Sequence, residues 1–191
     1  MKFYLITMIT TLFMAVGTVS AQNVNIGTKI GLNSHTINSD NNSDFDSRIG
    51  IHAGLIGHIH LNNEFALQPE IMYSMQGAKS GNTELKLDYI NIPVLAQYMF
   101  DNGFRLQAGP QLGFLINAKG ENNDSSNDLK DDFKSLDAGL SFGVGYIHPP
   151  TSFGIDARYN LGISDISESA NVETTNRGFQ IGIFYLFNHS D

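Results

Sequence analysis

The sequence contains no cysteine and no tryptophan, and only 11 of its 191 residues are lysine or arginine. The absence of cysteine excludes structural disulfides, thiolate catalysis and a lipidated amino-terminal cysteine. The basic residues are outnumbered by 19 aspartates and glutamates, which gives a formal net charge of −8 at pH 7. Because phosphate backbones are bound by clustered positive charge, we expect no nucleic-acid partner.

Long apolar runs are also absent, except for one at the amino terminus. Lys2 precedes the mostly apolar residues 3–16, and Val19-Ser-Ala21 offers small residues before a cleavage site. This pattern is typical of a secretory signal peptide, so we expect residues 1–21 to be removed and residues 22–191 to form the mature domain. An inner-membrane anchor is less favoured, because threonines interrupt the segment and a spanning helix needs about 20 mostly apolar residues.

The rest of the chain alternates between apolar residues and polar or small ones, and 19 residues are glycine. The clearest case is residues 178–187, where Phe179, Ile181, Ile183 and every second residue thereafter are apolar. Residues of one parity share one face of a strand, so the segment predicts a strand with a continuous apolar face. Eight segments show this alternation at about 10 residues or more, the length a tilted strand needs to cross a bilayer: residues 24–32, 49–61, 65–76, 89–100, 104–117, 136–146, 153–162 and 178–187.

The connections between these segments alternate in length. Short links occupy residues 62–64, 101–103 and 148–152, whereas long polar links occupy residues 36–47, 77–84, 118–134 and 163–177. Short turns on one side and long loops on the other are typical of outer-membrane barrels. The sequence therefore predicts an all-β fold, an eight-stranded antiparallel up-and-down transmembrane β-barrel. We expect it in the cell outer membrane, with both termini periplasmic because the strand number is even.

A soluble, lipocalin-like periplasmic binder would show the same alternation with its apolar residues pointing inward. Three features favour the membrane barrel. The polar faces are rich in glycine, as a narrow interior requires, and the apolar faces are long and uniform. Aromatic residues also gather near the ends of the segments, as they do at membrane interfaces: Tyr98, Phe100, Phe104, Tyr146, Phe153, Tyr159, Tyr185 and Phe187.

Five charged residues on the polar faces are expected to form a polar network in the lumen: Glu70, Arg105, Asp137, Asp156 and Arg158. Buried charges must pair or they cost several kcal/mol each. We expect Arg105 to pair with Asp137 first, and Arg158 to pair with Asp156 or Asp137. An eight-stranded barrel is just wide enough to be filled by side chains, so a polar plug is favoured over a pore.

Histidines on one inward face raise the question of a metal site. His52, His58 and His60 share that face, and His58 and His60 are about 6–7 Å apart between Cα atoms. Two imidazoles at this spacing can bind one metal ion, but a competent site needs three or four ligands. A hydrogen-bonded lumen network with Glu70 as partner is the favoured interpretation. We therefore expect no metal site and no cofactor.

Two further patterns are candidates for a catalytic site and a Ca²⁺ site. Ser34 and His35 lie near the end of the first segment, but adjacent residues of a strand point to opposite faces and cannot act as nucleophile and base. The acidic stretch with Asp40, Asp44 and Asp46 lacks the spacing and the glycine of a calcium loop, so a solvated loop is favoured over Ca²⁺ binding. We expect no catalytic residue.

Five motifs resemble the PorT-like outer-membrane β-barrel proteins of the Bacteroidota, and together they span nearly the whole mature chain: Lys29-Ile-Gly-Leu-Asn33, Leu67-Gln-Pro-Glu-Ile-Met-Tyr-Ser74, Tyr89-Ile-Asn-Ile-Pro-Val-Leu95, Gln107-Ala-Gly-Pro-Gln-Leu-Gly113 and Gly182-Ile-Phe-Tyr-Leu-Phe187. The resemblance implies a small outer-membrane barrel, similar to OmpX in architecture, and some relatives are tied to type IX secretion. It supplies no catalytic motif.

The expected function is that of a non-enzymatic integral outer-membrane protein with a structural or interaction role in the cell envelope. The expected partners are outer-membrane lipid or lipopolysaccharide, and envelope or secretion proteins. Three alternatives stay open at this point: an accessory to type IX-like secretion or envelope assembly, an outer-membrane lipid-modifying enzyme, and the soluble lipocalin-like binder.

Overall fold

The computed structural model describes residues 24–39, 45–122, 125–169 and 173–187. The predicted signal peptide lies outside these residues. The elements are, in chain order, β1 (Val24–Ser39), β2 (Asp46–His60), β3 (Phe65–Ser80), β4 (Thr83–Met99), β5 (Phe104–Glu121), β6 (Ser126–Asp128), η1 (Lys130–Asp132), β7 (Leu136–His148), η2 (Pro149–Thr151), β8 (Phe153–Gly162) and β9 (Thr174–Leu186).

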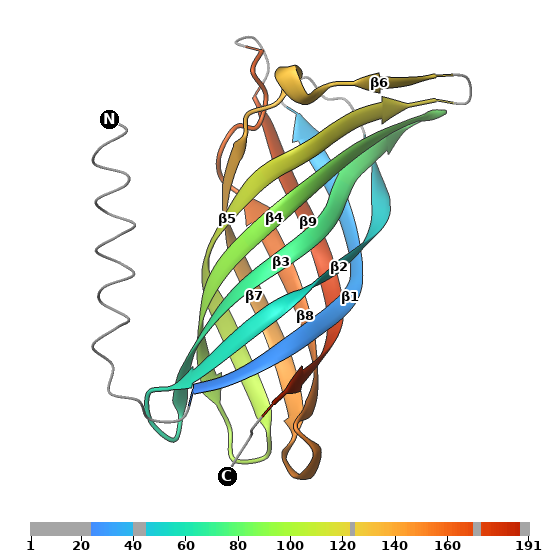
Figure 1. Cartoon of the computed structure of the whole chain (residues 1–191). Coiled ribbons are helices and arrows are strands. Elements are labelled where there is room, and N and C mark those ends of the chain that lie inside the picture. The colour runs from blue at the N-terminus through green and yellow to red at the C-terminus, as the bar shows by residue number, and fades with distance from the viewer. Residues whose placement is uncertain (1–23, 40–44, 123–124, 170–172, 188–191) are drawn as a thin grey trace.

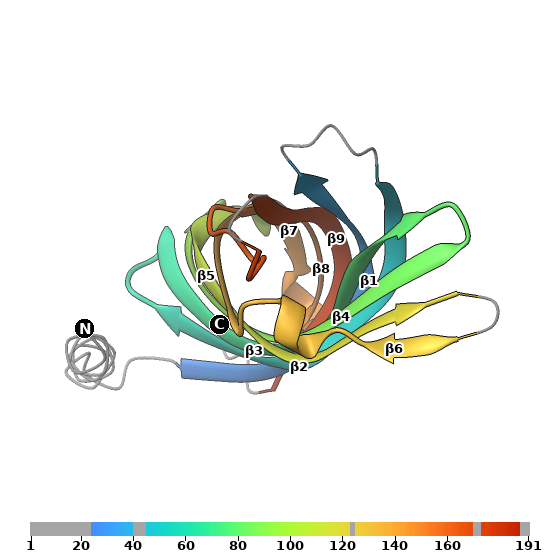
Figure 2. The ribbon, with the colours of Figure 1, turned by 90° about the horizontal axis from the view of Figure 1, so that it is seen from above.

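Eight of these nine strands close into one antiparallel barrel (Figures 1 and 2). The hydrogen-bonded order runs β4-β3-β2-β1-β9-β8-β7-β5, and a β4–β5 ladder completes the ring. The first and last strands pair along most of their length, from Gly27 opposite Leu186 to Ser39 opposite Thr174. Closure leaves the barrel without an open edge, which is what lets a sheet satisfy its backbone groups inside a bilayer. The predicted eight-stranded all-β barrel is confirmed.

Apolar side chains cover the outside of the barrel and polar ones line its interior. Phe179 and Ile181 on β9 are 64% and 67% exposed, whereas Gln180 between them is buried. The same alternation runs through the other barrel strands. This arrangement is the reverse of a lipocalin, so the soluble-binder alternative is not favoured. None of the described helical turns is long and apolar enough to cross a membrane.

The barrel has two unlike ends, here called the turn end and the loop end. The turn end carries the short connections after β2, β4 and β7, together with the start of β1 and the end of β9 (Figure 1). The loop end carries the connections after β1, β3, β5 and β8, with β6 and η1 among them. β6 pairs only with the last residues of β5, so it extends the sheet beyond the closed ring.

Strands at the loop end are longer than the alternation predicted. Residues 77–84 were expected to form a loop, but β3 and β4 continue through them and meet at a two-residue turn, Gly81-Asn82. Gly81 has a φ of 56°, which glycine adopts without strain. Apolar alternation fades where both faces of a strand meet water, but the backbone ladder continues, as Lys79 opposite Glu84 shows.

Two apolar clusters occupy the lumen near its ends. At the turn end, Ile56, Ile147, Phe184 and Leu186 pack together. At the loop end a larger cluster contains Ile37, Ala78, Leu87, Tyr89, Leu115, Ala118 and Ile166. These residues point into the lumen or lie in the loop after β8, and Ala118 does so on the opposite parity from Leu115 because the β4–β5 register shifts between them. The clusters therefore lie above and below the polar middle of the lumen.

Candidate functional site: a charged network in the lumen and a cavity at the loop end

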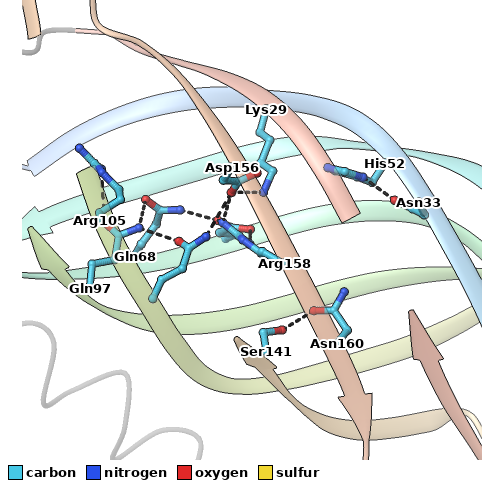
Figure 3. A network of polar contacts seen from close by, with 12 residues as sticks. Lys29, Asn33, His52, Gln68, Gln97, Arg105, Ser141, Asp156, Arg158 and Asn160 are labelled. Carbon is cyan, nitrogen blue, oxygen red and sulfur yellow. Dashed lines mark hydrogen bonds and ion pairs between the residues drawn. The ribbon is translucent and has the colours of Figure 1, made fainter. Parts of the chain in front are cut away.

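An ion-pair chain crosses the middle of the lumen (Figure 3). Lys29 Nζ on β1 lies 2.5 Å from Asp156 Oδ2 on β8, and the same oxygen lies 2.7 Å from Arg158 Nη2. Arg158 reaches across to Glu70 on β3, with Nη1 2.7 Å from Oε2 and Nη2 2.6 Å from Oε1. This is a bidentate arginine–carboxylate pair, the strongest geometry for such a contact.

Three glutamines extend the chain into a ring. Gln68 Nε2 donates to Glu70 Oε1 at 2.6 Å, and Gln97 Nε2 donates to both Gln68 Oε1 and Gln107 Oε1 at 2.9 Å. Gln107 Nε2 then lies 3.4 Å from Asp156 Oδ2, which returns the network to its ion pairs. Side chains from β3, β4, β5 and β8 are therefore joined across the lumen.

The charged groups of the network are buried and paired. The side chains of Glu70 and Arg158 are 0% and 2% exposed, and those of Lys29 and Asp156 are 1% and 2% exposed. Removing such charges from water costs several kcal/mol per ion, which only close pairing and full hydrogen bonding can offset. The arrangement suits a structural plug.

The five charged residues predicted for the lumen all lie on inward positions and are buried. Arg158 and Asp156 are brought together, and Glu70 joins them. Arg105 and Asp137 do not pair. Arg105 lies opposite Gly145, near the turn end, where its guanidinium approaches Gln97 and the ring of Phe184.

Asp137 lies at the other end of the same strand pair, opposite Gly113. Its carboxylate accepts a hydrogen bond from Ser164 Oγ at 3.1 Å and lies 3.5 Å from Asn176 Nδ2. The separation from Arg105 follows from the antiparallel register, because residues early in β5 pair with residues late in β7. A small cavity of about 10 Å³ next to Asp137, His35 and Gln76 has room for about one water molecule.

Lys29 is a lumen residue that sequence reasoning did not include in the network. The signal was present, because Lys29 has the same parity as Asn25 and Gly31 on the polar face of the first segment. A lysine in the middle of an inward face needs a carboxylate partner. That the partner would be Asp156, 127 residues away, depends on which strands face each other across the lumen.

The histidines contact other side chains of the lumen. His52 Nδ1 is hydrogen-bonded to Asn33 Oδ1, and the rings of His58 and His60 meet edge to face with centroids 4.5 Å apart. Glu70, the expected histidine partner, instead binds Arg158 and Gln68. Within residues 24–39, 45–122, 125–169 and 173–187, no group of three or more histidine, aspartate or glutamate side chains could hold a metal ion.

Ser34 and His35 occupy opposite faces of β1. His35 is buried in the lumen, whereas Ser34 lies on the outside of the barrel. The two therefore cannot form a nucleophile and base pair. Asp40 and Asp44 of the acidic stretch considered for Ca²⁺ binding lie outside the described residues, and Asp46 begins β2.

The loop end carries a second candidate site, an open cavity of about 680 Å³. Its apolar floor lies over the loop-end cluster, and the loops after β5 and β8 form one side. These loops are joined by Lys134 N to Ile166 O at 2.8 Å and Glu168 N to Asp132 O at 3.0 Å. Lys134 Nζ also lies 2.5 Å from Asp165 Oδ2, and this contact, with the backbone amides of Thr174 and Ser167, lowers the pKa of Asp165 to about 2.

Comparison with known proteins agrees with this architecture. A family model described as "Outer membrane protein beta-barrel domain" matches residues 20–168. Neisserial surface protein A shares 16% identity, with a TM-score of 0.62 over 87% of this chain and 100% of that chain. Ail, the attachment invasion locus protein of Yersinia pestis, shares 16% identity, with a TM-score of 0.53 over 87% and 100%. At this identity the likeness shows the fold alone. A search of curated proteins finds no match.

Proposed function

The chain belongs to the family of outer membrane protein β-barrel domains, and from that premise we propose that it is a non-enzymatic surface module whose loop end recognises its partner. The observation that carries this proposal is the contrast between a filled lumen and an elaborated loop end. Paired charges, glutamines and two apolar clusters fill the interior. The long strand extensions, β6 and η1 lie at one end (Figure 1). The residues that line the open cavity belong to the same end.

This contrast favours recognition over transport. A passage for solutes would have to separate the Arg158–Glu70 pair and displace an apolar cluster at either end. Breaking a buried pair costs about 3–5 kcal/mol. By contrast, loops on a rigid scaffold can vary without disturbing the barrel, which is why binding residues so often lie on them.

The membrane location follows from the family, and the orientation is part of the proposal. We place the turn end and both termini in the periplasm and the loop end outside, as the short-turn and long-loop rule for these barrels implies. Residues 1–21 then serve as the export signal. The apolar outer face contacts outer-membrane lipid, including lipopolysaccharide.

The nature of the partner is constrained by charge. Ail is named for attachment and invasion, and one of its structures contains the heparin analogue sucrose octasulfate. The present chain carries a net charge of −8, so a polyanion of that kind is disfavoured here. A partner with positive or neutral contact groups fits the loop end better.

The finer family assignment leads to the second candidate role. Resemblance to PorT-like barrels of the Bacteroidota supports a place among envelope-assembly or secretion proteins, with such proteins as the partners. A lipid-modifying activity has less support, because Ser34 and His35 lie on opposite faces of β1.

Cysteine labelling tests the proposed orientation, since the natural chain has no cysteine to interfere. Asn82→Cys places a thiol in the β3–β4 turn at the loop end, and Asp101→Cys places one at the turn end. In intact cells a membrane-impermeant maleimide should label N82C and leave D101C unlabelled until the outer membrane is permeabilised. Labelling of D101C in intact cells would contradict the orientation.

The interaction role is tested with the same variant. A photocrosslinker attached to N82C should trap a discrete partner in intact envelopes, whereas one attached to D101C should not trap that species. If neither variant yields a crosslinked band above the untagged background, the loop end is not a recognition surface for an envelope protein.

A further inference from the structure

The cavity at the loop end has the composition of a small-molecule site. Four half-buried apolar side chains line it and pack on the loop-end cluster beneath: Phe45, Leu85, Leu129 and Phe133. A volume of about 680 Å³ falls within the 300–1,000 Å³ typical of ligand pockets. These side chains pack on the loop-end cluster inside the lumen, so contact with lipid on the outer face does not account for their exposure.

The walls of the cavity are fixed by backbone hydrogen bonds. Phe133 and Ser167 form an isolated antiparallel bridge between the two loops. The bonds from Lys134 N to Ile166 O and from Glu168 N to Asp132 O flank that bridge, and Ile166 N donates to Thr174 O at 2.8 Å. A cavity held in this way is preorganised, which reduces the entropy lost when a ligand binds.

Two acidic residues of the lining have no basic side-chain partner within the described part of the chain. Asp132 and Glu168 are exposed residues of the lining, and the hydrogen bond between their backbones holds them across the loop bridge from each other. Neither forms an ion pair within the described part of the chain. Like charges held opposite each other are unfavourable, and a cation placed between them removes the repulsion.

The nearby lysines are engaged elsewhere. Lys134 Nζ is bound to Asp165, and Lys130 Nζ lies 3.2 Å from the carbonyl oxygen of Ile116. Lys86 pairs with Glu121 on the neighbouring strands. Within the described residues, Asp132 and Glu168 therefore have no ion-pair partner above the apolar floor.

We propose that the cavity lined by Phe45, Leu85, Leu129 and Phe133 binds a small cationic amphiphile, with its apolar body on these side chains and its amine between Asp132 and Glu168. The proposal deepens the proposed function, because it names a ligand class for the same loop end. It depends on the cavity and its charge, and not on the orientation of the barrel in the cell.

The test uses the full mature chain in zwitterionic phosphatidylcholine nanodiscs, where both ends are accessible. Dansylcadaverine is the probe, because its amine is cationic and its fluorescence rises and shifts to the blue in an apolar site. Empty nanodiscs correct for partition into lipid. Saturable binding above that background is expected, and dansyl-6-aminohexanoate, which has a similar apolar body and a carboxylate, should bind at least about tenfold more weakly.

Three variants separate the effect of charge from the effect of the cavity. D132N/E168Q should weaken dansylcadaverine binding about five- to tenfold, as expected for two partly exposed ion pairs. E64Q/D101N removes the same charge at the turn end and should leave binding within about twofold. Ser39→Phe fills the cavity without changing charge and should abolish binding. Boiling-dependent migration on a gel confirms that each variant is a folded barrel. If S39F does not fold, the two charge variants test the proposal without it.

Three outcomes would overturn the proposal: no saturable binding above empty nanodiscs, equal binding of the anionic probe, or equal weakening by D132N/E168Q and E64Q/D101N. None of these outcomes depends on the cysteine-labelling result. If cysteine labelling contradicts the orientation but the probe still binds as expected, the proposed function is overturned and the ligand proposal is not.

Discussion

At the scale of single residues, Arg158 is the centre of the lumen. It binds both oxygens of Glu70 and one oxygen of Asp156, while Lys29 shares that same aspartate oxygen. A guanidinium is suited to this position because its planar fork can serve two carboxylates at once. Each of these groups would be costly alone in the lumen, so the pairs are interdependent.

Glu70→Gln should destabilise the barrel by about 3 kcal/mol or more, because it leaves Arg158 buried with one carboxylate shared with Lys29. Urea unfolding in phosphatidylcholine vesicles, followed by circular dichroism because the chain has no tryptophan, gives the free energy of unfolding. Lys86→Gln is the matched control, since its pair with Glu121 is 29% and 36% exposed and should cost under about 1 kcal/mol. Equal losses in the free energy of unfolding for the two variants would show that the buried pair stabilises the barrel no more than the exposed pair does.

At the scale of elements, close approach of neighbouring strands determines where side chains are tolerated. An added Cβ at Gly54 would lie 2.0 Å from the carbonyl oxygen of Ile71 and 2.8 Å from the Cα atom of Met72. On the same strand, a Cβ at Gly57 would meet nothing closer than Pro69 Cγ at 3.4 Å. β2 therefore contains one glycine that its neighbour requires and one that it does not.

Gly54→Ala should destabilise the barrel by about 1–3 kcal/mol, because β2 and β3 must move apart to admit the methyl group. Gly57→Ala should be neutral or stabilising by up to about 1 kcal/mol, because alanine restricts the unfolded chain. Thermal or urea unfolding of both variants under the same conditions measures the difference. If Gly57→Ala lowers the free energy of unfolding as much as Gly54→Ala does, the close approach of β2 and β3 at Gly54 is not the cause of the loss.

At the scale of the whole molecule, the barrel is a filled cylinder with long loops and strand extensions at one end. Its lumen holds an apolar cluster at the turn end, a charged ring in the middle, and a second apolar cluster under the loop-end cavity. The first and last strands are hydrogen-bonded to each other, so the closed ring has no edge at which to open. The groups that fill the lumen and the proposed recognition surface are thus separated along the barrel axis.

A single copy in a planar lipid bilayer should give no steady conductance, because no continuous water path passes the clusters and the ring. Phe184→Ala, which opens the turn-end cluster alone, should also remain silent because the charged ring still fills the middle. Current recordings at both polarities check this, with protein incorporation verified by boiling-dependent gel migration. A reproducible ohmic conductance from the natural chain would contradict the filled lumen.

The sequence by itself determined the barrel, its apolar outside and its two unlike ends. Alternation with a period of two is a local property, so each segment reveals its own inward and outward faces, and Phe179 and Gln180 fall as predicted. The positions of the short links could also be predicted from the sequence, because they too depend on local residues. Strand lengths at the loop end were underestimated, because residues 77–80 continue the ladder after the apolar pattern has faded.

Only the tertiary structure decided which inward side chains meet. Glu70 and Arg158 are 88 residues apart and Lys29 and Asp156 are 127 apart, and their contacts depend on closure, register and position across the lumen. The same register places Arg105 and Asp137 at opposite ends of their strand pair, although both are inward and opposite in charge. The cavity with Asp132 and Glu168 is likewise a product of two loops joined by backbone hydrogen bonds, because contacts between distant segments leave no periodic pattern in either one.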